Sequence, residues 1–139
     1  MAISEHDKQM TVTAAITIME SAYAPYSQFQ VGAAILDEQG NLHHGVNVEN
    51  AAYPNGSCAE TGAIAAMIAA GGSQIDCIAI AGRGEHLCTP CGACRQRIRE
   101  FASPQMVISI CDETGIRAEF SLDELLPYSF GPDHLDAVE

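Results

Sequence analysis

Two short stretches, Ser57-Cys58-Ala59-Glu60 and Thr89-Pro90-Cys91-Gly92-Ala93-Cys94, decide how this chain is interpreted. They place a Cys-x-Glu motif ahead of a Pro-Cys-x-x-Cys motif. Three thiolates can hold Zn²⁺ tetrahedrally and leave a fourth position for water, and a nearby carboxylate that is not a ligand can carry protons. The stretches therefore predict one catalytic zinc per chain, held by Cys58, Cys91 and Cys94, with Glu60 as the catalytic residue.

A fourth cysteine beside the second stretch leaves two other interpretations open. Residues 88–94 contain a Cys-x-x-Cys-x-x-Cys run, which is similar to that of ferredoxin iron–sulfur clusters, but the further cysteine and proline of that pattern do not follow. A structural zinc held by Cys58, Cys88, Cys91 and Cys94 is the second interpretation. The remaining cysteines, Cys77 and Cys111, lie in apolar segments and are expected to be core residues.

The cysteines of both motifs are expected at helix starts. Cys91 and Cys94 are three residues apart and fall on one helix face. Unpaired N–H groups and the positive end of the helix dipole favour thiolate over thiol at such positions. Cys58 and Glu60 would point about 200° apart on an ideal helix, so we expect Cys58 at the very first turn.

Length and composition indicate a single domain, residues 1–139, large enough to fold without a metal staple. No apolar run approaches the roughly 20 residues needed to span a bilayer, and the first residues do not resemble a secretory signal. We therefore expect a cytoplasmic protein without membrane partners, whose six cysteines are thiols or metal ligands rather than disulfides.

The charge of the chain bears on its partners. With 18 acidic and 6 basic residues, the formal net charge is -12. Polynucleotide binding draws its affinity from phosphate neutralisation by Lys and Arg, which this chain can barely provide. We expect no nucleic-acid partner, and a small-molecule substrate instead.

Hydrophobic periodicity and turn residues predict an alternation of helices and strands. Helices are expected at 11–24, 58–70 and 92–101, with a short capped one from Ser121 that Pro127 ends; strands at 31–37, 42–48, 75–81, 106–111 and 116–120. The last dozen residues are predicted to form a surface tail. This order predicts an α/β fold with three α/β/α layers around one mixed five-stranded sheet.

Five segments of the chain, taken together, closely resemble the small homotetrameric zinc-dependent cytidine deaminases. They are Tyr26-Ser27-x-Phe29-x-Val31-Gly32-Ala33, Asn47-Val48-Glu49-Asn50-Ala51-Ala52-Tyr53, Cys58-Ala59-Glu60, Pro90-Cys91-Gly92-Ala93-Cys94-Arg95-Gln96 and Leu125-Leu126-Pro127-x-Ser129-Phe130-Gly131-Pro132. The Cys and Glu pattern alone is already the zinc deaminase signature. The resemblance covers nearly the whole chain in order, so it implies the cytidine deaminase fold as well.

The resemblance also implies roles for residues outside the metal site. Asn47 and Glu49 would bind the ribose hydroxyls; two apart on an extended segment, they point to the same side. Phe29 would pack against the base, and Ala59 would contact it through its backbone. Tyr53 and Phe130 match positions that line the site of a neighbouring subunit, so the family implies composite active sites in a homotetramer.

The implied reaction is hydrolytic deamination of cytidine and deoxycytidine to uridine and deoxyuridine, releasing ammonia, within pyrimidine salvage. Zinc lowers the pKa of a bound water from about 16 towards 7, and Glu60 would move its proton to the ring and then to the leaving amine. The substrate would be a free nucleoside.

Thr61 departs from the family pattern. Many relatives carry Arg after the catalytic Glu, where it partly offsets the three thiolates; Thr61 cannot do so, and Arg95 is one candidate to replace it. Blasticidin-S deaminases also lack that Arg, so a deaminase of blasticidin S or another aminopyrimidine is an alternative. Outside enzymes, the alternative is a zinc-stabilised binding module that never releases ammonia.

Overall fold

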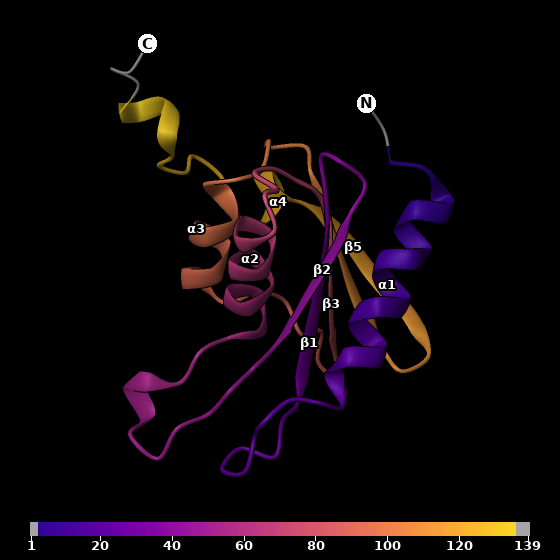
Figure 1. Cartoon of the computed structure of the whole chain (residues 1–139), viewed down its shortest axis with the longest axis vertical. Coiled ribbons are helices and arrows are strands. Elements are labelled where there is room, and N and C mark those ends of the chain that lie inside the picture. The colour runs from indigo at the N-terminus through magenta and orange to yellow at the C-terminus, as the bar shows by residue number, and fades with distance from the viewer. Residues whose placement is uncertain (1–2, 136–139) are drawn as a thin grey trace.

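A mixed sheet of five strands forms the centre of the molecule, as the computed structural model of residues 3–135 shows (Figure 1). The strands are β1 (Val31–Asp37), β2 (Leu42–Val46), β3 (Ile75–Gly82), β4 (Val107–Asp112) and β5 (Gly115–Ser121). Their order across the sheet is β2-β1-β3-β4-β5. Only β3 and β4 run parallel, and the other neighbours are antiparallel. The predicted mixed five-stranded sheet is confirmed.

The central strands are buried on both faces, which explains their continuous apolar sequences. In β3, seven of the eight residues are buried, and β1 is buried from Gly32 onward. A strand that reads as a run of Ala, Ile and Val, rather than alternating with polar residues, needs cover on both sides. The edge strand β5 carries no fully buried residue, and in β2 only one is buried.

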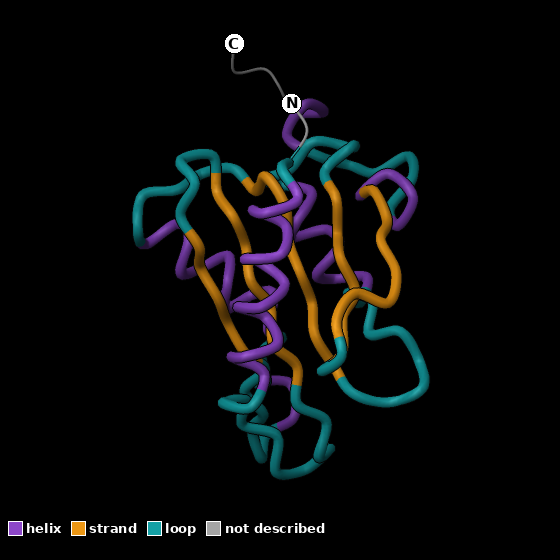
Figure 2. Tube along the Cα trace, turned by 90° about the vertical axis from the view of Figure 1, so that its right-hand side faces the viewer, coloured by secondary structure: helices purple, strands orange, loops and turns teal. Residues whose placement is uncertain are grey.

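Helix α1 (Glu5–Met19) covers one face of the sheet alone (Figures 1 and 2). The prediction of a helix over 11–24 placed both ends too late. Ser4 is the N-cap, and its side-chain oxygen accepts a hydrogen bond from the Asp7 N–H at 3.0 Å. The helix ends at Met19, well before Pro25, because the chain turns there so that Tyr23 can pair with the segment at Val48. The helix could not have continued past Pro25, but its actual end, at Met19, lies six residues earlier.

Helices α2 (Ala59–Ala69) and α3 (Gly92–Arg99) cover the opposite face, and they complete the three layers. Their apolar side chains share one core with those of the sheet, among them Met67, Ile98 and Ile110. Gly45 of β2 permits α2 to approach closely, since a Cβ there would lie 2.4 Å from the Ala63 backbone nitrogen. Among the described residues, no helix is long and apolar enough to cross a membrane.

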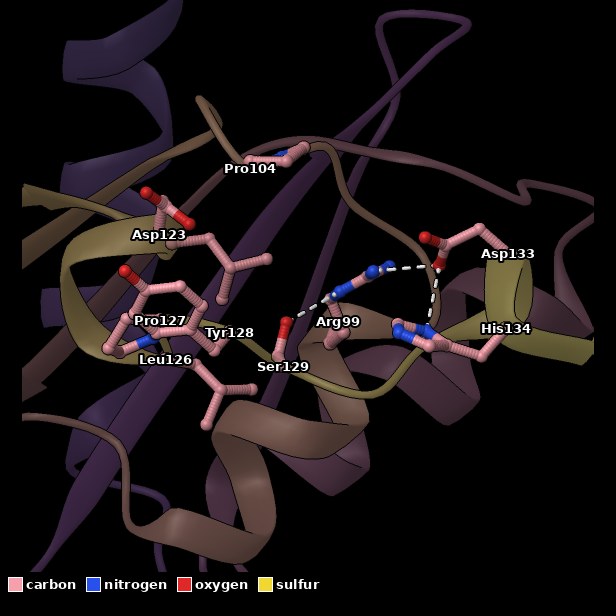
Figure 3. Close-up of a pocket in the computed structure, with 10 residues that line it drawn as sticks. Arg99, Pro104, Asp123, Leu126, Pro127, Tyr128, Ser129, Asp133 and His134 are labelled. Atoms are coloured by element: carbon pink, nitrogen blue, oxygen red, sulfur yellow. Dashed lines mark hydrogen bonds and ion pairs between the residues drawn. The ribbon is translucent and has the colours of Figure 1, made fainter.

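The segment after α4 (Leu122–Leu125) folds back onto α3 instead of trailing away. Arg99 Nε donates to Ser129 Oγ and Arg99 Nη2 to Asp133 Oδ1, both at 2.8 Å, as Figure 3 shows. Gln96 Nε2 also donates to the Phe130 carbonyl at 2.8 Å. Residues 128–135 lie mostly on the surface, as expected, but they are hydrogen-bonded to α3 and do not form a free tail. Residues 136–139 of that expectation lie outside the described part of the chain.

Candidate metal centre and nucleoside site

Three sulfur atoms meet where α2 and α3 begin. The Sγ atoms of Cys58, Cys91 and Cys94 all lie within 4.8 Å of one another, the only such group of potential ligands among residues 3–135. Cys58 and Cys91 are the N-cap residues of α2 and α3, with extended backbones, and Cys94 lies in the first turn of α3. Cys58 thus lies one residue before the first helical turn, in which it was predicted. Its backbone is extended, so the 100° step between successive helical residues does not force its side chain away from that of Glu60.

The spacing and chemistry of the three sulfurs suit a zinc ion. Tetrahedral Zn–S bonds of about 2.3 Å place sulfurs about 3.8 Å apart, which is compatible with the 4.8 Å limit. Burial, followed by the charges of Glu60 and Cys58, raises the pKa of the Cys94 thiol. Three thiolates packed this closely repel one another, and a divalent cation would remove that repulsion.

Helix starts do not favour the thiolate equally at the three positions. Backbone N–H groups of Cys94 and Ala93 help to lower the pKa of Cys91, as the sequence predicted. Burial instead raises the pKa of Cys58 and of Cys94. Burial thus opposes the thiolate form at these two positions, against the direction expected from the helix starts alone.

Cys88 lies outside the sulfur cluster, which argues against both alternative metal sites. It packs against the core beside Gly82, where a Cβ would come within 3.0 Å of its Sγ. Burial, with the charges of Glu60 and Cys58, raises its pKa to about 11. Neither a four-cysteine structural zinc nor an iron–sulfur arrangement through Cys88 fits this geometry. Cys77 and Cys111 are buried core residues, as predicted.

Glu60 lies in the first turn of α2, close to the sulfurs, and is only 5% exposed. Burial raises the pKa of its carboxyl, while contacts with its own backbone and Cys94 and the charge of Arg97 oppose the rise. Ala59, its neighbour, is 1% exposed. A carboxyl with a raised pKa beside a metal position is suited to take and return protons.

Asn47 and Glu49 brace the loop before β1. Asn47 Oδ1 accepts from the Val31 N–H at 2.8 Å, and its Nδ2 donates to the Phe29 carbonyl at 2.9 Å. Glu49 Oε1 accepts from the N–H groups of Tyr26 and Ser27 at 2.9 and 3.1 Å, and Oε2 accepts from the Ser27 hydroxyl. These hydrogen bonds to residues 26–31 were not predicted, because the sequence did not show that this loop would lie beside Asn47 and Glu49.

A pocket of about 400 Å³ opens at this loop. Its lining is Tyr26, Ser27, Glu49, Asn50, Tyr53 and Gly56. Phe29 is not part of this lining; the tip of its ring lies near Gly82, and the residue is 41% exposed. The volume is within the range of about 300–1,000 Å³ typical of small-molecule sites.

Tyr53 and Phe130 lie on exposed segments. Tyr53 is 74% exposed and touches Tyr26 edge to face, with ring centroids 6.0 Å apart. Phe130 is 55% exposed and stacks on His134. A hollow of about 670 Å³ is lined by Arg99, Pro104 and residues between Leu122 and His134 (Figure 3). Neither aromatic ring is buried within its own chain.

Arg97, not Arg95, is the arginine beside the sulfurs. Arg95 donates to the carbonyls of Pro90 and Leu125 at 2.7 and 2.8 Å, so it fixes the chain around α3. Arg97 Nη1 donates to Cys94 Sγ at 3.6 Å. Its position three residues after Cys94, on the same helix face, was the signal in the sequence that could have identified it.

The sequence profile described as "Cytidine and deoxycytidylate deaminase zinc-binding region" matches residues 5–110. This chain belongs to that family. Its metal cofactor is zinc, for which the sulfur cluster provides ligands.

Named relatives of this family member cover more than four fifths of its length. It is 40% identical over 116 residues to a cytidine deaminase of Sporosarcina psychrophila, covering 84% of this chain and 85% of the relative. A cytidine deaminase of Mycobacterium tuberculosis is 39% identical over 115 residues, covering 82% of each chain. The crystal structure of cytidine deaminase from Burkholderia pseudomallei has a TM-score of 0.82 and 38% identity, covering 92% of this chain and all of that one. The predicted α/β fold and the resemblance to the cytidine deaminases are both confirmed.

Proposed function

We propose that this chain catalyses the hydrolytic deamination of cytidine and deoxycytidine to uridine and deoxyuridine, with release of ammonia. One observation carries the proposal: three sulfurs within 4.8 Å of one another lie beside a buried carboxyl, in a fold whose named relatives are cytidine deaminases. Zinc, when bound, supplies the activated water that attacks carbon 4 of the cytosine ring.

Glu60 moves the protons of the reaction. Its carboxylate takes a proton from the attacking water and delivers it to ring nitrogen 3, which makes carbon 4 electrophilic. It then takes the proton of the new hydroxyl group on carbon 4 and gives it to the departing amine, so that ammonia leaves as the carbonyl forms. The low exposure of Glu60 keeps bulk water from competing for these protons. Cys58, Cys91 and Cys94 hold the metal, and the backbone of Ala59 contacts the base.

Asn47 and Glu49 bind the ribose through the donor and acceptor positions that are not used in their hydrogen bonds to the loop before β1. Asn47 has a second Nδ2 hydrogen to give, and a Glu49 carboxylate has about four acceptor positions, three of them used. A ribose hydroxyl can accept from the first residue and donate to the second. Phe29 packs against the base, and its partial exposure leaves a ring surface for that contact.

The working unit is a homotetramer with composite sites. Tyr53 and Phe130 are exposed aromatic side chains, and such groups are enriched at interfaces between chains. Each would reach the nucleoside site of a neighbouring chain. We place the protein in the cytoplasm, where free nucleosides are salvaged.

The decisive experiment follows the ultraviolet spectrum of cytidine with purified protein, before and after zinc chelation. We expect conversion to the uridine spectrum with equimolar ammonia, loss of conversion on chelation, and recovery with added zinc. Deoxycytidine and blasticidin S are run in parallel. A spectrum of cytidine that never changes with the zinc-loaded protein would contradict the proposal, and faster turnover of blasticidin S would reassign the substrate.

A further inference from the structure

Arg97 contacts a sulfur of the metal cluster. Its Nη1 donates to Cys94 Sγ at 3.6 Å, and Cys94 itself is fully buried. The structure assigns Arg95 to backbone carbonyls and Arg99 to Ser129 and Asp133, so Arg97 is the arginine of α3 that faces the sulfurs.

The zinc-loaded site would carry a net negative charge that a nearby cation can offset. Three thiolates around Zn²⁺ sum to one negative charge, and the adjacent Glu60 carboxylate adds another when ionised. Glu60 and Cys94 are buried, so solvent screens their charges poorly, whereas Cys91 and Arg97 are exposed and are screened more. No Lys or Arg other than Arg97 makes a hydrogen bond to a cysteine of the cluster within residues 3–135.

Thr61 of α2 and Arg97 of α3 line one surface groove, together with Ile64, Gln96, Glu100 and Phe101. A positive side chain placed on α3 therefore reaches the region next to Thr61, where α2 itself offers only a short neutral side chain.

We propose that Arg97 is a positioning residue of the zinc centre: it donates an N–H···S hydrogen bond to Cys94 and offsets the negative charge of the three thiolates, in place of a cation at Thr61. The inference rests on the proposed function only in taking the cluster to be the zinc site of the reaction. Partners of this kind, which touch a ligand rather than the metal, typically change metal affinity or activity by about 10–100-fold when removed.

The test measures zinc affinity by competition with a chromophoric chelator, in the full-length protein. Arg97→Gln is expected to bind zinc about tenfold more weakly and to turn over cytidine more slowly. The double variant Thr61→Arg/Arg97→Gln is expected to regain most of the affinity, because its new guanidinium enters the same groove. Arg97→Lys, which keeps charge but not the planar fork, should fall between.

Two controls and a spectroscopic readout separate this role from helix stabilisation. Arg99→Gln removes another cation from the last turn of α3, and Arg83→Gln removes one that pairs with Glu20 and Glu113; both should keep the zinc affinity of the parent. In cobalt-substituted protein, loss of a hydrogen bond to a thiolate moves the sulfur-to-cobalt charge-transfer band to longer wavelength. Arg97→Gln alone among the three is expected to show this shift.

The results divide cleanly. Unchanged zinc affinity and an unmoved cobalt band in Arg97→Gln would overturn the assignment, and so would an equal loss in Arg99→Gln. If the parent protein failed to deaminate cytidine, the proposed function would fall, while the affinity and the cobalt band would still decide the role of Arg97.

Discussion

His43 Nε2 lies 2.7 Å from Asp37 Oδ2, and both side chains are buried, at 8% and 1% exposure. Asp37 Oδ1 also accepts from the N–H groups of Gln39 and Asn41 at 2.8 and 2.9 Å. One carboxylate thus fixes the turn between β1 and β2. Burial opposes its charged form, but the hydrogen bonds outweigh burial and lower the pKa of Asp37 below its ordinary value.

Asp37→Asn is predicted to destabilise the fold by roughly 2–4 kcal/mol, because a buried hydrogen-bonded charge is replaced by an amide that cannot accept all three bonds. A group whose folded-state pKa is depressed contributes stability above its unfolded pKa, near 3.8, and loses that contribution as pH falls through the folded value. Urea unfolding at several pH values should therefore show the largest gap between parent and variant near neutrality, and a shrinking gap in acid. A gap independent of pH would contradict this account.

The sequence predicted the strands and the metal ligands because both depend on local patterns. The run from Val31 to Leu36 is apolar and a turn follows Asp37, and β1 spans Val31–Asp37 as predicted. The spacing of Cys91 and Cys94 fixes them within one helical turn. The Asp37–His43 contact was not predicted, since it depends on the register of β1 and β2, which places Ile35 opposite His43.

Contacts between distant segments account for the remaining differences. The Arg99 bonds to Ser129 and Asp133 join residues 30 or more positions apart, so no periodicity reports them. The choice between Arg95 and Arg97 depended on which way each side chain leaves α3. Arg95 donates to the carbonyl of Leu125, the last residue of α4, a contact that exists only because α4 packs beside α3.

Glu60→Gln is predicted to retain zinc and lose about 10²–10⁴-fold in kcat, since the amide cannot take up a proton. The three sulfurs are untouched, and Gln fits the space of Glu. Metal content and single-turnover rates measured on one preparation check both halves. Near-parental turnover in a zinc-loaded variant would remove Glu60 from the reaction.

Gly45→Ala is predicted to destabilise the protein by about 1–3 kcal/mol or more, through overpacking between β2 and α2. The new Cβ would lie 2.4 Å from Ala63 N and 2.6 Å from Ala59 O, and backbone atoms cannot move aside as a side chain can. Gly56→Ala is the matched control, because its nearest contact would be an ordinary 3.5 Å. Thermal unfolding of the two variants should differ clearly; equal midpoints would mean that α2 can shift freely.

Cys88→Ala is predicted to keep one zinc per chain, whereas Cys91→Ala should lose it. Cys88 packs on the core outside the sulfur cluster, and its thiol has a pKa raised to about 11 by burial. Metal analysis after gel filtration distinguishes the two variants. Zinc loss in Cys88→Ala with an intact circular dichroism spectrum would instead favour a four-cysteine structural site.

Mixing two inactive variants tests the composite site. Phe130 is 55% exposed and lies on the segment held by Arg99 and Gln96, whereas Glu60 is buried inside its own chain. If Phe130 serves a neighbour, an oligomer assembled from Glu60→Gln and Phe130→Ala chains contains sites with a native Glu60 and a native Phe130. Co-expression of the two variants is therefore predicted to give more deaminase activity than either homo-oligomer alone. The control pairs Glu60→Gln with Cys58→Ala: because both residues belong to one chain's own metal centre, a Glu60→Gln partner cannot supply the ligand that the Cys58→Ala chain lacks. Equal activity from both mixtures would show that Phe130 acts within its own subunit.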